Sequence, residues 1–133
     1  MNDDLYTNKV IADIVKKNYE SIKNDLFFIS SEKGYFSPFR SGGMVPEKIV
    51  TEIFLRMIVS SLEIGDKSIL KEQYIWTKDM LVSRGYGCEL FLNNYLSYLE
   101  DLKQVMIKYA NEQNHFLISQ YIEGCKKHFL QSI

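Results

Sequence analysis

The sequence is organised around residues 46–67, which read PEKIVTEIFLRMIVSSLEIGDK. Pro46 suits the first turn of a helix, because the N–H group that proline lacks has no acceptor inside the helix there. Up to Glu63, apolar residues cover most of the helix and leave a narrow polar stripe of Lys48, Glu52, Arg56 and Glu63. A helix this widely apolar is expected to be central and largely buried. Glu52 and Arg56 lie four positions apart and are expected to form an ion pair.

A turn is predicted directly after this helix, at Gly65-Asp66. Glycine favours the left-handed conformation that often follows a helix, and aspartate favours the N-cap of the next one. A second helix is therefore expected over Lys67–Ser83, before the turn Gly85-Tyr86-Gly87.

Further helices are predicted on both sides of this pair, because apolar residues recur there at three- and four-residue steps. They are expected over Leu5–Ile29, Cys88–Ala110 and Glu112–Gln131. Asn111 either separates the last two or lies within one long helix. Both prolines lie in or beside a breaker-rich segment at 30–45, and no stretch alternates as a strand would. The sequence predicts an all-α bundle forming one domain, residues 1–133.

The composition excludes several classes of protein. The 133 residues include 16 Lys and Arg against 17 Asp and Glu, so the basic excess typical of nucleic-acid-binding proteins is missing. No apolar run approaches the length of about 18 residues that a membrane span needs. The acidic start, Met1–Asp4, does not resemble a signal peptide, and Cys88 and Cys125 are too few for a disulfide framework. We therefore expect a cytoplasmic protein.

Motifs for catalysis are missing from the sequence, which has no Gly-x-Ser-x-Gly, no phosphate-binding glycine loop and no His-Glu-x-x-His. Cys125 and His128 are spaced to share a metal ion, but His115 lies several turns away and a third ligand is not evident. Both histidines lie in the last expected helix, a poor place for a proximal haem ligand. We expect no enzyme and no metal site.

Aromatic residues make up 14% of the chain, and many of them fall on the inward stripes of the expected helices. The inward set is Tyr19, Phe54, Tyr74, Trp76, Tyr95, Tyr109, Tyr121 and Phe129. Trp76, the only tryptophan, is expected to anchor the core, and the alternative is that it forms the wall of a pocket.

Residues 55–67, LRMIVSSLEIGDK, resemble the middle of a phycobiliprotein, and allophycocyanin subunits are the most similar. The specific likeness covers 55–85, where a Leu-Arg helix, a Gly-Asp turn and a helix of matching length follow one another. The resemblance implies a globin-like helical fold that lacks the family's two N-terminal extension helices. It also implies homo- or hetero-oligomers, because subunits of the family pair and stack into rings.

The same resemblance implies that covalent pigment chemistry is lost. The family attaches a linear tetrapyrrole to a cysteine at the position of Glu47, which cannot form a thioether. Val50 replaces an aspartate that contacts the pyrrole nitrogens, Leu81 replaces a tyrosine wall, and Trp76 replaces a small residue. Phe54, with Ile53, corresponds to an aromatic pair of the family.

Two functions follow as expectations. In the first, the chain binds or senses a small apolar or tetrapyrrole-like ligand non-covalently, in a cleft lined by Val50, Phe54, Met57, Tyr74, Trp76 and Leu81. In the second, the pocket is repacked and the chain is a colourless structural or protein-interaction module. Its contact surface is then the helix over 88–110, with Tyr95, Tyr98 and Tyr109.

Overall fold

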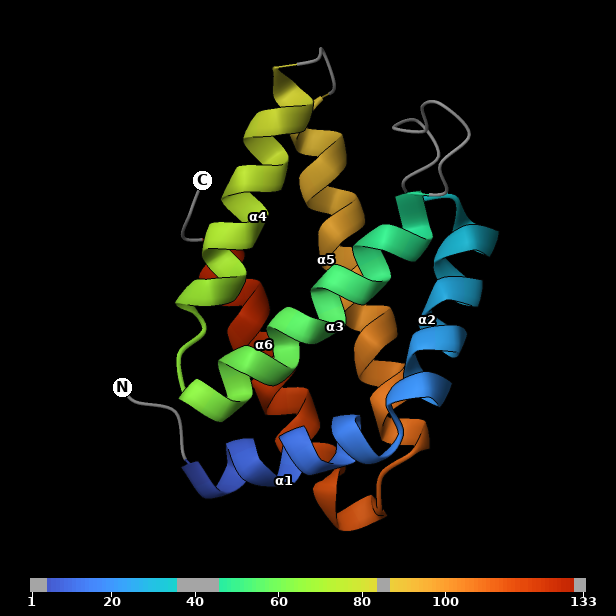
Figure 1. The fold of residues 1–133 in the computed structure, drawn as a ribbon, viewed down its shortest axis with the longest axis vertical. Coiled ribbons are helices and arrows are strands. Elements are labelled where there is room, and N and C mark those ends of the chain that lie inside the picture. The colour runs from blue at the N-terminus through green and yellow to red at the C-terminus, as the bar shows by residue number, and fades with distance from the viewer. Residues whose placement is uncertain (1–4, 36–45, 84–86, 131–133) are drawn as a thin grey trace.

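The computed structural model describes residues 5–35, 46–83 and 87–130, with the side chains of 46, 47, 80, 81 and 88 left out. These residues form six α-helices and one short 3-10 turn, and none of them is in a strand (Figure 1). The helices are α1 (Leu5–Lys17), α2 (Tyr19–Lys33), α3 (Pro46–Ile64), α4 (Ser68–Val82), α5 (Cys88–Lys108) and α6 (His115–Leu130), with η2 (Glu112–Asn114) before α6. The predicted all-α bundle is confirmed.

The first expected helix, Leu5–Ile29, is wrong, because it is two helices with a break at Asn18. The Asn18 side chain donates a hydrogen bond to the Ile14 carbonyl at 2.9 Å, a local bond of the kind that competes with helix formation. The chain turns there, so that α1 lies across the base of the molecule and α2 rises beside α5 (Figure 1). This bend lets both helices pack against α3.

The second helix of that pair also extends further than expected, into the breaker-rich segment. It ends at Lys33, where Gly34 adopts a left-handed φ of 65° and donates its N–H group to the Ser30 carbonyl. The remaining part of the segment, 36–45, lies outside the described residues, as do Gly85, Tyr86 and Gln131.

The predicted Gly65-Asp66 turn is confirmed. Gly65 has a φ of 79° and Asp66 caps α4, because its Oδ1 accepts the Ser68 N–H at 2.9 Å. This turn sets the end of α3 and the start of α4. All four ends of these two helices lie within one residue of the expected bounds. Asn111 also marks a break, since η2 follows it and α6 begins at His115, so the alternative of one long helix is excluded.

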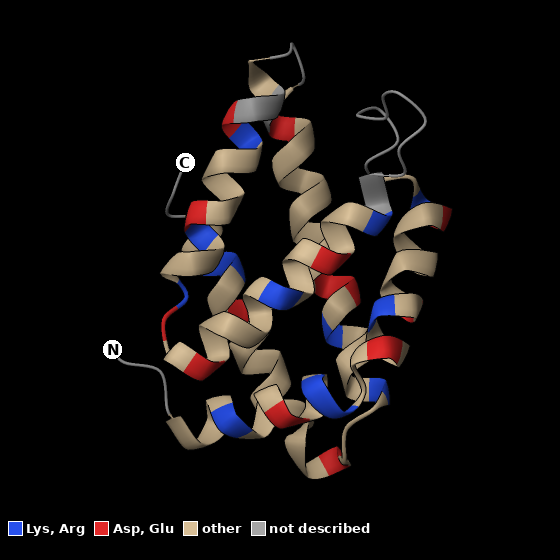
Figure 2. Ribbon diagram, in the orientation of Figure 1, with Lys and Arg blue, Asp and Glu red and all other residues tan. Residues whose placement is uncertain are grey.

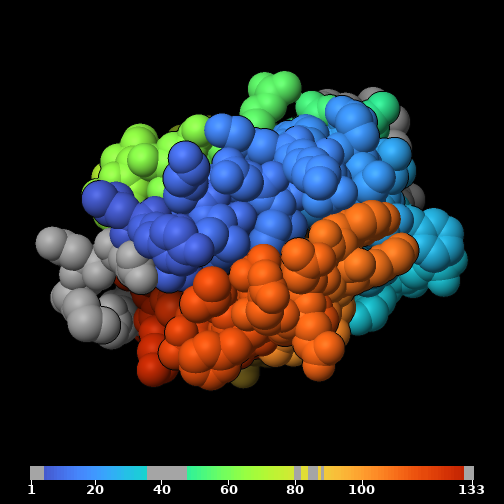
Figure 3. Space-filling view, turned by 90° about the horizontal axis from the view of Figure 1, so that it is seen from below, coloured from blue at the N-terminus to red at the C-terminus, as the bar shows by residue number. Residues whose placement is uncertain are grey.

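Helix α3 runs obliquely across the bundle and packs against α1, α2 and α4, while α5 packs against α2 and α6 (Figure 1). Seen from below, α1 lies beside the end of α5 and the start of α6 and closes that end of the core (Figure 3). The expectation that α3 is largely buried is only half right. Ile49, Ile53 and Ile64 lie on its exposed side.

Candidate functional site

Aromatic rings fill the space between α3, α4, α5 and α6. Five of them, named the ring cluster here, are at most 1% exposed: Phe54, Tyr74, Phe91, Tyr95 and Phe129. Tyr74 stacks on Phe91 and Phe129 with ring centroids 5.4 and 5.0 Å apart. Tyr95 meets Phe54 and Tyr74 edge-on at 5.6 and 5.0 Å. These are the separations of rings in direct contact, so this part of the interior is packed by the protein's own side chains.

The polar atoms beside the ring cluster have partners within the protein. The Tyr95 hydroxyl donates to Gln73 Oε1 at 2.8 Å, and burial raises the pKa of Tyr95 well above its ordinary value. Thr51 shares a hydrogen bond with the Tyr98 hydroxyl, and Ser61 with that of Tyr121. A tyrosine that stays protonated and is already hydrogen-bonded stabilises a core and is not prepared for proton transfer.

The six residues expected to line a ligand cleft do not share a location. Phe54 and Tyr74 belong to the ring cluster, and Val50 and Met57 are partly buried against the core. Trp76 is 67% exposed on the far side of α4. Leu81 lies in α4, and its side chain is outside the described residues, as is that of Glu47 in α3.

The expectation that Trp76 anchors the core is wrong, and helix geometry explains why. Leu70 and Tyr74 are four residues apart and both face inward. Trp76 comes two residues after Tyr74, which places it roughly 200° around the helix and therefore on the solvent side. Tyr74 and Trp76 cannot share one face of a helix. Their spacing in the sequence therefore already indicated that only one of them could face the core.

The contact surface expected on the helix over 88–110 is also wrong. Tyr95 and Tyr98 are buried, and Tyr109 is partly buried, with its hydroxyl donating to Asp25 at 2.6 Å. These rings hold α5 against the rest of the bundle. They are not available to another protein.

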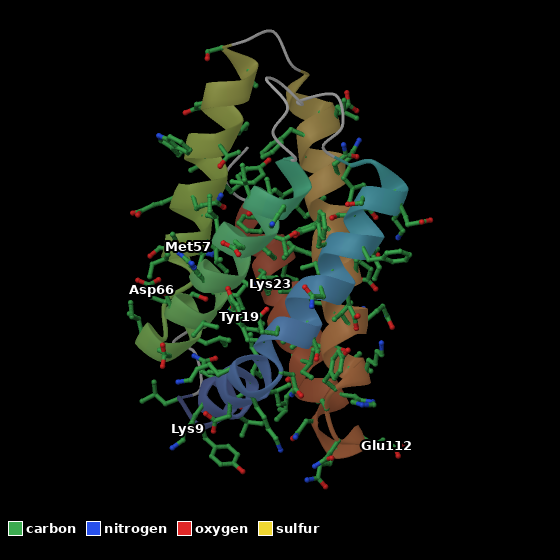
Figure 4. All side chains as sticks on the ribbon, turned by 45° about the vertical axis from the view of Figure 1, so that its right-hand side comes forward. Lys9, Tyr19, Lys23, Met57, Asp66 and Glu112 are labelled. Carbon is green, nitrogen blue, oxygen red and sulfur yellow. The ribbon has the colours of Figure 1, made fainter. Side chains whose placement is uncertain are left out.

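A surface hollow of about 640 Å³ lies where the bend between α1 and α2 crosses α3. Its lining residues are Lys16, Tyr19, Glu20, Lys23, Glu52, Arg56, Val59 and Ser60. Tyr19 and Lys23 lie on the side of α2 that faces α3 (Figure 4). We call this feature the elbow hollow. None of the five expected cleft residues whose side chains are described lines it.

Charged side chains dominate the elbow hollow. Lys23 contacts Glu20 at 3.1 Å and Glu52 at 3.5 Å, and Arg56 contacts Glu52 at 3.9 Å, which confirms the expected ion pair. The hydrogen bond to Glu63 raises the pKa of Lys16, and that to Glu20 raises the pKa of Lys23. Both pKa values move away from neutrality, so neither lysine is prepared to act as a base. Sequence reasoning missed this hollow because the bend at Asn18 was not expected.

Two further carboxylates, Glu100 and Asp101 of α5, are held by hydrogen bonds and ion pairs. Glu100 contacts Lys103 at 2.7 Å and Lys126 at 2.5 Å, and these hydrogen bonds lower its pKa to about 2. Asp101 accepts hydrogen bonds from Tyr35 at 2.6 Å and from Lys33 at 2.8 Å. The bond between Lys33 and Asp101 joins the end of α2 to α5.

No family model, curated protein or solved structure matches the chain. The resemblance to phycobiliproteins therefore stays a prediction. Within the described ranges, no three His, Cys, Asp or Glu side chains are grouped to hold a metal ion, and no helix there has the length and apolar content to cross a membrane.

Proposed function

We propose that this chain is a non-enzymatic protein-interaction module whose interior is packed by its own side chains. The supporting observation is the burial of Phe54 and Tyr74 in the ring cluster. In the family that the sequence resembles, the positions of Phe54 and Trp76 border the pigment. In this chain, Phe54 packs into the core and Trp76 is exposed to solvent.

The chemistry of the elbow hollow does not favour the alternative of an apolar or tetrapyrrole-like ligand. Sites for such ligands are concave and mostly apolar, with a few polar groups that fix orientation. Five of the eight side chains that line the elbow hollow are charged. An apolar ligand seated there would strip water from these charges without replacing their hydrogen bonds.

Exposed apolar side chains on α3 and α4 supply a surface for a partner. Ile49, Ile53 and Ile64 are exposed on α3, and Trp76 is exposed on α4, which packs directly against α3. Tryptophan is among the residues that contribute most to binding energy in interfaces. A module that presents this surface would act by holding a partner and not by changing a substrate.

A ligand titration tests this proposal. Biliverdin, phycocyanobilin and haem are added separately to the purified protein, and the visible spectrum is followed. We expect no shifted band with any of them, because Phe54 and Tyr74 are buried against other rings of the ring cluster. A saturable shifted band would contradict the proposal and favour the ligand-binding alternative. The Trp76→Ala variant is the matched control, because it keeps the ring cluster and removes the one exposed indole.

A further inference from the structure

Helices α2 and α5 lie side by side and run in opposite directions (Figure 1). Both carry acidic and basic residues (Figure 2). Near the end of α5, three side chains join the two helices. Asp25 of α2 accepts a hydrogen bond from the Tyr109 hydroxyl at 2.6 Å and another from the Lys108 ammonium at 3.0 Å. The same ammonium lies 5.2 Å from the centre of the Tyr109 ring. The hydrogen bond from Tyr109 lowers the pKa of Asp25, so this carboxylate is charged at neutral pH.

A second cluster of the same composition joins the two helices in the opposite sense. Asp101 of α5 accepts hydrogen bonds from the Tyr35 hydroxyl at 2.6 Å and from the Lys33 ammonium at 2.8 Å, at the end of α2. The Lys33 ammonium lies 5.6 Å from the centre of the Tyr35 ring. In each cluster, a lysine and a tyrosine at the C-terminal end of one helix hold an aspartate of the other helix. We name the clusters the Asp25 clasp and the Asp101 clasp.

Helix α2 itself contributes little to the apolar core. Its buried residues are Ile22, Leu26 and Ser30, so only two apolar side chains are fully buried over 15 residues. Helix α6 buries five side chains over 16 residues. The backbone leaves the helical conformation on both sides of α2, at Asn18 and at Gly34. Segments with few buried apolar contacts open at a lower free energy than the core of the same protein.

Helix α2 and Tyr35, which follows it, cover one face of α5. Asn94 donates a hydrogen bond to the Tyr35 carbonyl at 2.6 Å, and Tyr98 meets the Tyr35 ring edge-on with centroids 6.4 Å apart. Asp101 and Val105 continue this face at steps of three and four residues. Tyr98 and Val105 are buried, so the covered face is apolar between its polar contacts.

We propose that α2 is a cover that opens as one unit, and that the Asp25 clasp and the Asp101 clasp hold it shut. Opening exposes the covered face of α5, while α5, α6 and the ring cluster stay folded. The clasp carboxylates are partly exposed, at 31% for Asp25 and 13% for Asp101, so each clasp adds a modest stabilisation that can be lost without unfolding the protein. The proposed function does not depend on this motion.

Hydrogen exchange of the backbone amides tests the proposal. In the wild type, the amides of residues 22–33 should share one protection factor, and it should be lower than that of α6. Asp101→Asn should speed their exchange by about fivefold, because the clasp loses its charged acceptor. The acceleration should be the same around Asp25, about two helical turns away. Glu32→Gln is the matched control and should exchange like the wild type, because Glu32 is an exposed carboxylate of α2 that belongs to neither clasp.

Two further variants separate opening as a unit from fraying of the helix ends. Asp25→Asn weakens the other clasp, and Tyr35→Phe removes one hydroxyl and keeps the ring. Each should speed exchange along the whole of α2 and leave α6 unchanged. An acceleration confined to the turn beside the altered clasp would overturn the proposal, because the two ends would then open separately. Equal acceleration in α2, α5 and α6 would also overturn it, because α2 would then open only when the whole protein unfolds.

Discussion

Helix α4 carries two aromatic residues on opposite sides, and their environments differ completely. Tyr74 is 1% exposed and stacks between Phe91 and Phe129, while Trp76, two residues later, is 67% exposed. A high aromatic content therefore has two meanings in this molecule. The inward rings hold the helices together, and the outward indole is available to a partner. The predictions below test this division.

The largest effect is expected at Tyr74. Replacing it with Ala removes ring contacts on three sides and leaves a cavity at the centre of the ring cluster. Losses of this kind reduce the free energy of unfolding by about 3–5 kcal/mol. Urea denaturation followed by circular dichroism measures the change. A loss below about 1 kcal/mol would mean that the rings do not form the core.

A smaller effect is expected at the turn that sets the direction of α4. Gly65 has a φ of 79°, which an L-residue adopts at a cost of roughly 1–2 kcal/mol. Gly65→Ala should lower the free energy of unfolding by this amount. Gly87→Ala is the matched control, because Gly87 has a φ of −69° and an added Cβ would meet only Leu90 at 3.9 Å. Equal losses in both variants would refute the role given to the Gly65 turn.

A still smaller effect is expected from the ion pairs of Glu100, which act outside the ring cluster. Its pKa of about 2 lies below the ordinary value of 4.5, so the carboxylate stabilises the folded state above pH 4.5. That contribution is lost as the pH falls from 4.5 toward 2. Because the side chain is 40% exposed, it amounts to less than about 1 kcal/mol. Glu100→Gln should lack this part of the acid dependence when unfolding is measured across that range. If Glu100→Gln showed the same pH dependence of unfolding as the wild type, the role given to these ion pairs would be contradicted.

The smallest effect on stability is expected at Trp76. Because its indole faces solvent, Trp76→Ala should change the free energy of unfolding by no more than about 0.5 kcal/mol. The same urea titration, at a concentration where the protein is monomeric, gives the value. A loss comparable to that of Tyr74→Ala would remove the distinction between the two sides of α4.

Local chemistry explains which parts of the fold could be predicted from sequence. Pro46, Gly65 and Asp66 define helix ends by their own backbone and side-chain preferences, so α3 and α4 were predicted within one residue. Asn18 was missed because the apolar spacing of Val15, Tyr19 and Ile22 continues unbroken across the bend. The elbow hollow depends on that bend, and no local pattern in the sequence indicated it.

The candidate site was harder to predict for another reason. Phe54 was expected beside a ligand because the resemblance placed a pigment there, and Tyr74 because it is an aromatic residue of a largely apolar helix. Whether such rings surround a ligand or pack together depends on Phe91, Tyr95 and Phe129, which come from two other helices. Helical periodicity shows that a residue faces inward, but it does not show what it meets there.

Acrylamide quenching of Trp76 emission, in protein dilute enough to be monomeric, tests the central claim most directly. The account predicts strong quenching and the emission of a water-exposed indole, unchanged when biliverdin is added. A blue-shifted emission that acrylamide hardly quenches would place the indole inside the bundle. That result would contradict the assignment of Tyr74 to the core and Trp76 to the binding surface.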